Sequence, residues 1–234
     1  MHPDLETLLV LQERDQAVTE CDGALAALEP ETRELDEALQ AAERGLEQAR
    51  RGVRDALGRR EELNGKIANY RSMQEQRRQR LEWVRGAKEA STLMAELDLA
   101  RSVLAKEEAE FMRSGDAVIA AELKVVDAEQ ALAAVRVAQA PRREGLAGRR
   151  DAIMGEREGA LAARDAQARL VPPGLLARYE RIRRGKAPLA LYRLHVDACG
   201  HCYTAVPTQR RALIVRGAAI EGCEACGVLL YAAE

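Results

Sequence analysis

A heptad repeat of apolar residues dominates the first 170 residues of the chain. From Leu11 onward, apolar side chains recur at alternating steps of three and four, which is the 3.5-residue period of a left-handed coiled coil. Seventeen of the 22 seam positions between Leu11 and Val84 are apolar, and the phase continues through Pro30. A second series, spaced by seven from Leu97 to Ala160, is apolar at nine of ten positions. The pattern predicts two long helices, each roughly 110 to 120 Å in length.

The segment between the two series predicts an antiparallel hairpin with its tip near residues 84–90. Gly86 is the residue there that most easily adopts turn dihedrals. The arms on either side have nearly equal lengths, and Pro30 and Pro141 lie at equal distances from the tip. Each proline removes a helical hydrogen bond, so we expect a joint kink where the two meet.

Two details inside the arms are interpreted as structural. The segment 114–116 (Ser-Gly-Asp) is turn-like, but Phe111 and Val118 keep the heptad phase across it, which favours a tolerated glycine. Cys21 falls on the seam, where a free thiol behaves as a small buried hydrophobe.

The heptad pattern ends at Val171, where two consecutive prolines predict an extended connection. We therefore assign residues 1–170 to the hairpin and 171–234 to a second module. There, an amphipathic helix is predicted from Leu175 to Arg184, with Gly185 as its C-cap. Short strands are predicted over residues 189–196, 212–216 and 228–231. The predicted fold is mainly α: a long antiparallel α-helical coiled-coil hairpin followed by a small β-rich module.

Four cysteines supply the stability that such short strands lack. Cys199 and Cys202 form one CxxC pair, and Cys223 and Cys226 form another after twenty residues. This spacing is typical of a structural zinc site. Four sulfurs at about 2.3 Å make a closed tetrahedron with no position for water, so one zinc ion would hold the fold and would not catalyse.

Other readings of the cysteines fit less well. Disulfides need an oxidising compartment, and the N-terminus lacks the basic start and cleavage site of a signal peptide. Cys-Gly-His-Cys also occurs in disulfide oxidoreductases, but no βαβ pattern surrounds it here. Haem attachment needs a histidine where Tyr203 and Gly227 stand. His201 could replace a cysteine as ligand but is expected to be exposed, and His195 is expected on a strand surface.

The stretch from Leu175 to Tyr231 resembles a known family: bacterial coiled-coil hairpin proteins with a C-terminal four-cysteine zinc ribbon. The helix sequence Tyr-Glu-Arg-Ile-Arg-Arg beside the paired CxxC motifs is the most specific part, and Pro30 and the residues after the tip also fit. The resemblance implies zinc on the four cysteines and a role in nucleic-acid or protein binding without enzymatic activity. Tyr203 departs from the pattern, because many ribbon knuckles carry glycine there.

The net charge of −2 hides an asymmetry. Residues from Arg169 onward carry a formal charge of +5, which leaves −7 on the arms. A basic patch on a small zinc module can neutralise phosphates, and Tyr192 and Tyr203 could stack on bases. The alternatives are that these arginines solvate a helix face or dock on the acidic base of the hairpin. The candidate nucleic-acid contacts are Arg178, Arg181, Arg183, Arg184, Lys186, Arg193, Arg210, Arg211 and Arg216.

Composition narrows the function classes. Only seven residues are aromatic while 43 are alanine, and Ala, Leu, Glu, Lys and Arg make up 135 of the 234 residues, which is typical of coiled coils rather than compact enzymes. The sequence has no phosphate-binding loop, nucleophile elbow or helical zinc-protease motif. It also has no apolar run long enough for a membrane span. We expect a cytoplasmic, non-enzymatic protein.

Two functional hypotheses remain. The first is an adaptor or regulatory protein that binds RNA or DNA through the basic module and a protein partner through the hairpin. The alternative is a purely protein-binding scaffold or chaperone-like factor for a transcription, flagellar or secretion system, as the family resemblance suggests. The oligomeric state and the role of a second basic cluster at the tip stay open.

Overall fold

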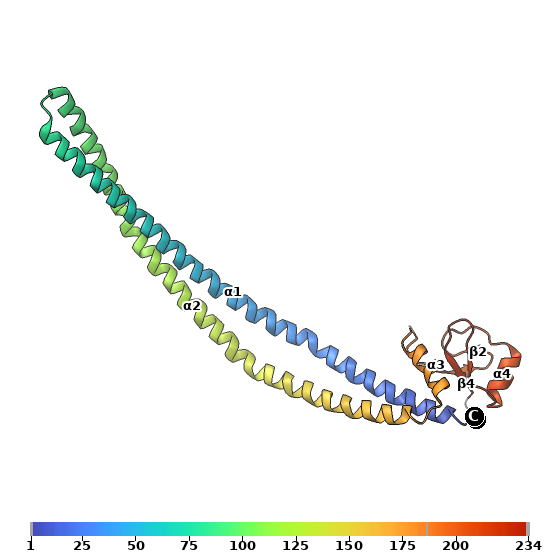
Figure 1. Ribbon diagram of the computed structural model, residues 1–234. Helices are drawn as coiled ribbons and strands as arrows, with labels where there is room; N and C mark the ends of the chain where they lie inside the picture. The colour runs from blue at the N-terminus through green and yellow to red at the C-terminus, as the bar shows by residue number, and fades with distance from the viewer. Residues whose placement is uncertain (1, 186, 233–234) are drawn as a thin grey trace. The chain divides into compact units, whose positions relative to one another are not determined.

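The computed structural model describes residues 2–185 and 187–232 and confirms the mainly α fold (Figure 1). Helix α1 spans Leu5–Trp83 and helix α2 spans Ala87–Ala168. Residues 84–86 connect them, inside the segment 84–90 that the sequence predicts as the tip. Among the described residues, no helix is both long and apolar enough to cross a bilayer.

The chain divides into two compact units. Residues 1–30 and 144–234 form the first, which we call the ribbon unit, and residues 31–143 form the second, the hairpin unit. The ends of the long helices therefore belong to the same unit as the cysteine module. The predicted boundary at Val171 coincides with the break between α2 and α3, inside the ribbon unit.

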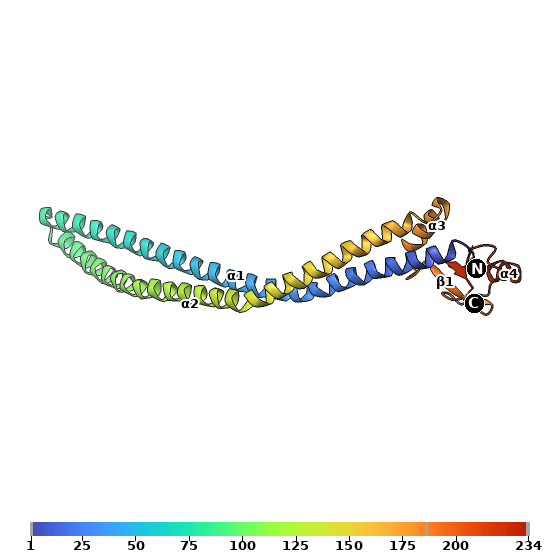
Figure 2. The same cartoon turned by 90° about the horizontal axis from the view of Figure 1, so that it is seen from below.

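The hairpin unit is held by the predicted heptad seam, which Figure 2 shows along much of its length as two helices side by side. Ion pairs cross between the helices outside the seam, for example Arg50–Glu129 at 3.0 Å and Arg71–Glu108 at 2.6 Å. These pairs are exposed and add little stability, but they mark the antiparallel register. The buried seam residues include Leu35, Leu46, Leu63, Ile67, Leu93, Leu97, Val118 and Leu132.

Neither proline interrupts its helix, because α1 continues through Pro30 and α2 through Pro141. Arg142 lies 3.6 Å from Glu31, so the residues that follow the two prolines meet across the hairpin. The division between the two units also falls beside both prolines. The joint kink itself stays a prediction.

The two structural readings inside the arms can be compared with the structure directly. Helix α2 is continuous through Gly115, which confirms a tolerated glycine, and the Ser114 hydroxyl donates to the Phe111 carbonyl at 2.6 Å. Cys21 is a free thiol and is half-buried rather than fully buried. Part of its surface therefore remains open to solvent.

A four-stranded sheet and two short helices complete the ribbon unit. The strand order is β2-β1-β4-β3, with β1 parallel to β4 and the other pairs antiparallel. Helix α3 ends one residue earlier than predicted, so that Arg184 rather than Gly185 is its C-cap. The elements are α3 (Pro173–Arg183), β1 (Leu191–His195), β2 (Ala198–Cys199), α4 (Thr208–Val215), β3 (Glu221–Gly222) and β4 (Leu229–Tyr231).

The predicted strand over residues 212–216 is wrong, because these residues end helix α4. Pro207 precedes the first turn, where its missing N–H costs nothing. Gly217, at φ +67°, closes the last turn, and the N–H of Gly217 and of Ala218 donate to the carbonyls of Ile214 and Leu213. Burial of Ile214 in the cluster around the cysteines outweighs the strand preference of the β-branched Ile214 and Val215.

The short strands obtain their core from the long helices. Leu5, Leu8 and Leu11 of α1 are buried together with Tyr179 of α3, and the central strands add Leu191 and Leu229 to the same cluster. A second cluster surrounds the cysteines and includes Ile214 and Val228. The ribbon unit is thus built from two segments of the chain that are distant in sequence.

Candidate metal centre

The two CxxC pairs converge as the sequence predicts. All four sulfur atoms lie within 4.8 Å of one another, and no histidine or carboxylate belongs to this group. Cys199 Sγ lies 3.8 Å from Cys226 Sγ, and Cys202 Sγ lies 3.6 Å from Cys223 Sγ. Tetrahedral ligands at about 2.3 Å from one ion are separated by about 3.8 Å, whereas a disulfide joins sulfurs at about 2.05 Å. The geometry fits four thiolates around one metal ion.

Two equivalent turns present the sulfurs. In the first, the Tyr203 N–H donates to the Cys199 carbonyl at 3.0 Å. In the second, the Gly227 N–H donates to the Cys223 carbonyl at 2.8 Å. The residue after each second cysteine is left-handed, at φ +58° for Tyr203 and +79° for Gly227. The departure noted at Tyr203 therefore places a tyrosine in a conformation that favours glycine.

Gly200 allows the first turn to lie against strand β1. A Cβ atom on Gly200 would come within 2.2 Å of the Arg193 carbonyl oxygen, which is far inside contact distance. No other residue type fits without moving one of the two backbones. Glycine inside the first CxxC is thus a packing requirement.

The thiols differ in how readily they release their protons. Burial raises the pKa of Cys199, and burial raises the pKa of Cys226 to about 12. A hydrogen bond with the Thr204 side chain, at 3.3 Å, lowers the pKa of Cys202 to about 6. Metal ligation requires thiolates, so an ion would have to displace the protons that burial holds on Cys199 and Cys226.

Both histidines near the cysteines are accounted for without ligation. The His201 ring packs on Tyr192 with a centroid separation of 4.7 Å. His195 is exposed on β1, as expected, and stacks on Tyr203 at 6.4 Å. The group that could hold a metal ion therefore consists of the four cysteines.

Three of the candidate nucleic-acid arginines make internal contacts. Arg183 pairs with Asp15 at 3.0 Å, so it docks on the acidic base of α1, which is one of the alternatives weighed from the sequence. Arg210 lies 3.0 Å from Glu224. Arg178 donates to the Ile220 carbonyl at 3.2 Å. These guanidinium groups stabilise the ribbon unit.

The remaining candidate arginines form no ion pair with a carboxylate in the described part of the chain. The Arg211 guanidinium donates to the Thr208 hydroxyl at 3.0 Å, and that of Arg216 donates to the Ala212 carbonyl of its own helix at 3.0 Å. Lys186 lies outside the described residues. Three further candidates are exposed: Arg181 on α3, Arg184 at the C-cap of α3 and Arg193 on β1.

Sequence reasoning missed two polar residues of α1 that organise the ribbon unit. The buried Asp15 carboxylate accepts a hydrogen bond from the Tyr179 hydroxyl at 2.7 Å and lies 3.0 Å from Arg164 as well as from Arg183. Gln12 Oε1 accepts from the backbone of β1, and its Nε2 donates to the Leu191 carbonyl. Both positions lie beside the seam, where a polar residue ordinarily faces water, so the heptad pattern gave no signal.

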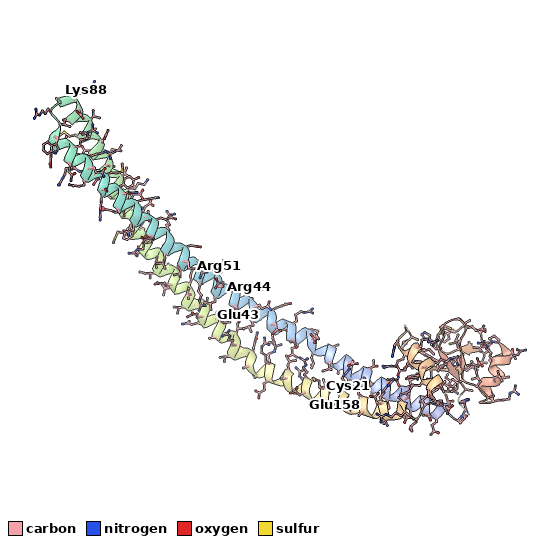
Figure 3. All side chains as sticks on the ribbon, viewed as in Figure 1. Cys21, Glu43, Arg44, Arg51, Lys88 and Glu158 are labelled. Atoms are coloured by element: carbon pink, nitrogen blue, oxygen red, sulfur yellow. The ribbon has the colours of Figure 1, made fainter. Side chains whose placement is uncertain are left out.

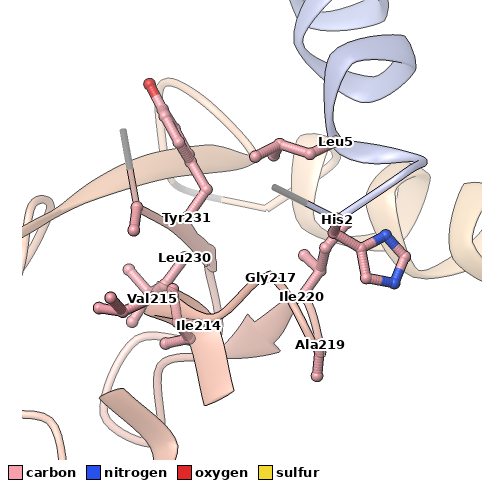
Figure 4. A pocket seen from close by; sticks show the side chains of 10 residues that line it. His2, Leu5, Ile214, Val215, Gly217, Ala219, Ile220, Leu230 and Tyr231 are labelled. Atoms are coloured by element: carbon pink, nitrogen blue, oxygen red, sulfur yellow. The ribbon is translucent and has the colours of Figure 1, made fainter. Parts of the chain in front are cut away.

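A small pocket of about 200 Å³ lies beside α4 and β4 (Figure 4). Leu5, Ile214, Ile220 and Leu230 line its walls, and Tyr231 stands at one side. No cluster of titratable side chains faces it among the residues that line it.

Comparisons with known proteins support the fold. No family model and no curated protein matches the sequence. CT398 from Chlamydia trachomatis is 17% identical, with 98% of this chain and 97% of that chain covered and a TM-score of 0.81. HP0958 from Helicobacter pylori CCUG 17874 is 16% identical over 95% and 97%, with a TM-score of 0.53. A Mycobacterium smegmatis protein is 20% identical over 97% of each chain, with a TM-score of 0.59.

At these identities the likeness concerns the fold alone. The helical hairpin and the four-cysteine cluster of the family resemblance are present in the structure. The function of this chain must therefore be argued from its own residues.

Proposed function

We propose that the protein is a non-enzymatic adaptor whose ribbon unit holds one structural zinc ion and binds single-stranded RNA or DNA, while its hairpin engages a protein. Zinc suits the centre because four thiolates in a closed tetrahedron are its usual structural ligand set. The ion would supply folding energy to a module whose strands have two to five residues each.

The observation that carries the nucleic-acid proposal is the set of arginines that the fold leaves without carboxylate partners in the described structure. Arg181 lies on α3 and Arg184 follows it as the C-cap, while Arg193 lies on β1 two residues before His195. Tyr203 is 75% exposed and stacks on His195. Exposed guanidinium groups contact phosphates and exposed rings stack on unpaired bases, which favours a single strand over a duplex.

The test is titration of fluorescent single-stranded RNA and DNA with the zinc-loaded full chain at several salt concentrations. We expect binding that weakens steeply with salt and a shallower salt dependence for the variant Arg181→Ala/Arg184→Ala. The matched control is Arg33→Ala/Arg44→Ala, which removes two exposed arginines from α1 (Arg44 is labelled in Figure 3) and should bind as the wild type does. Absence of binding at low salt would refute the proposal.

The second candidate is a scaffold that binds only proteins, and the internal use of Arg178, Arg183 and Arg210 favours it. Three of the nine candidate nucleic-acid contacts then stabilise the ribbon unit instead of binding a nucleic acid. Purification from cells under low salt, followed by analysis of both bound protein and bound nucleic acid, distinguishes the two. Protein without nucleic acid would support the scaffold.

A further inference from the structure

The end of the hairpin exposes a large apolar side chain. Trp83, the last residue of α1, is 85% exposed. Most tryptophans in folded proteins are largely buried, because the indole ring has a large apolar area. A single exposed apolar residue needs no special explanation, so the side chains around Trp83 decide whether it marks an interaction site.

Two cations without ion-pair partners lie beside Trp83 in the sequence. Arg85, in the connection, and Lys88, in the first turn of α2 and labelled in Figure 3, are both exposed. Neither forms an ion pair in the part of the chain that the structure describes, and the same holds for one nearby carboxylate, that of Glu82. The free charge at the end of the hairpin is therefore positive.

The other arginines at this end of the hairpin are neutralised by carboxylates. They form the pairs Arg77–Glu96 at 3.2 Å, Arg78–Glu75 at 3.4 Å and Arg80–Glu89 at 3.1 Å. Pairing of this kind removes most of the basic cluster that the sequence places at the tip. It leaves Trp83, Arg85 and Lys88, which we call the tip surface.

The small size of the tip surface favours a lipid bilayer over a protein or a nucleic acid. A helix with its side chains is about 10–12 Å wide, so two helix ends cover roughly 200 Å², whereas a stable protein interface takes about 800 Å² from each partner. Single-stranded nucleic acid is held by a basic groove and several stacked rings, and the tip surface has one ring. A bilayer needs no matching shape, and tryptophan is enriched at its headgroup level.

We propose that the tip surface binds peripherally to a membrane that contains anionic lipids. The Trp83 ring enters the headgroup region, while the long side chains of Arg85 and Lys88 stay at the level of the lipid phosphates. Each of the two cations strengthens binding to an anionic surface roughly fivefold. Such binding needs no helix that crosses the bilayer, and with one ring and two cations it is weak and reversible. It is independent of both zinc and the nucleic-acid proposal.

Fluorescence of Trp83 tests the proposal, because it is the single tryptophan of the chain. The zinc-loaded full chain is titrated at low salt with vesicles of phosphatidylcholine that contain one third phosphatidylserine. The emission should shift to shorter wavelengths, and lipids with brominated acyl chains should quench it. Both effects should be absent with pure phosphatidylcholine and should disappear in ~1 M salt, where the Debye length is about 3 Å. Adsorption through arginines of the ribbon unit would leave Trp83 emission unchanged.

Charge reversal separates the tip surface from the overall charge of the protein. Arg85→Glu/Lys88→Glu should raise the lipid concentration for half-maximal shift at least ~20-fold. The matched control is Lys106→Glu/Arg113→Glu, which reverses two exposed cations of α2 that also lack ion pairs among the described residues, and it should bind as the wild type does. All four side chains are exposed, so circular dichroism should show unchanged helix content.

Three results would overturn the proposal. The first is unchanged Trp83 emission with the anionic vesicles at low salt. The second is an equal loss of binding in Lys106→Glu/Arg113→Glu, which would make overall charge the cause. The third is quenching of Trp83 by single-stranded RNA without any response to vesicles, which would assign the tip surface to nucleic acid.

Discussion

Tyr203 and Gly227 can be compared directly, because both adopt a left-handed backbone conformation at the same position of a cysteine turn. A non-glycine residue in this conformation costs about 1–2 kcal/mol. We predict that Gly227→Ala lowers the stability of the zinc-loaded ribbon unit by about 1 kcal/mol, although no atom lies within 4 Å of the new Cβ. Denaturant titration with zinc release as the readout measures it.

Tyr203→Gly is the converse of this substitution and should preserve or raise stability. If it relieves the strain while weakening binding of single-stranded RNA or DNA, the strained tyrosine is retained for function. Equal losses of stability in Gly227→Ala and Gly200→Ala would contradict the assignment of backbone strain to the first and a steric clash to the second. Gly200→Ala meets the Arg193 carbonyl and should cost much more.

Because of Tyr179, the stability of the ribbon unit should change with pH in the alkaline range. Burial, and then the hydrogen bond to Asp15, raises the pKa of Tyr179 well above its usual value. The folded state therefore retains a proton that the unfolded state releases near pH ~10. The stability that the protonated Tyr179 hydroxyl contributes to the folded state is fully present below pH ~10 and is lost as the pH rises above it.

We predict that Tyr179→Phe loses about 1–2 kcal/mol at neutral pH, because the hydrogen bond to the charged Asp15 disappears. Above pH ~10 its stability should fall less steeply than that of the wild type. Denaturant unfolding at pH values on both sides of ~10 provides the comparison. Tyr203→Phe, at an exposed tyrosine, should keep the wild-type slope; a variant at Tyr179 that also keeps it would contradict the prediction.

Pro30 and Pro141 define the next prediction, which concerns the two long helices. Both residues are exposed, and a proline inside a helix costs roughly 3 kcal/mol relative to alanine. We predict that Pro30→Ala and Pro141→Ala each raise the thermal stability of the helices, as followed by circular dichroism. Spin labels placed on either side of residue 30 should report a narrower distance distribution in the double variant, because the joint kink is removed. Unchanged distributions would show that the prolines do not bend the arms.

The elements differ in how much of them the sequence could predict. The seam through Leu35 and Leu63 follows from periodicity, because burial repeated every 3.5 residues leaves a strong pattern. Helix α4 was not predicted, because eight residues are too few to show a helical period of apolar positions. Its last two residues, Ile214 and Val215, are β-branched and favour a strand. The end signals were present, since Pro207 and Gly217 delimit the helix. Short elements are decided by their caps and by what they pack against.

Polar contacts between distant parts of the chain were the least predictable. The four cysteines could be grouped because CxxC spacing and zinc coordination restrict each other. Asp15 and Gln12 carry no such local signature, because their partners Tyr179 and Leu191 lie more than 160 residues away. Arg178, Arg183 and Arg210, which the sequence suggested as nucleic-acid contacts, instead bind other parts of the ribbon unit. Charge counts alone therefore overestimate a binding surface.

Removal of the metal should separate the behaviour of the two units. The strands of the ribbon unit are two to five residues long, so we predict that the cysteine module, residues 187–232, unfolds when zinc is chelated. The hairpin unit has its own seam and carries the chain's single tryptophan, Trp83. Hydrogen exchange should show lost protection over residues 187–232, while helix content and Trp83 fluorescence change little.

Two cysteine variants complete this experiment. Cys223→Ser should reproduce the chelated state and reduce the zinc content from one ion per chain to none. Cys21→Ser changes a cysteine outside the cluster and should retain both zinc and protection. If the module keeps its protection without metal, the clusters around Tyr179 and Ile214 are sufficient for folding, and the ion then serves another purpose. If chelation also abolishes binding of single-stranded RNA, that binding requires the folded cysteine module.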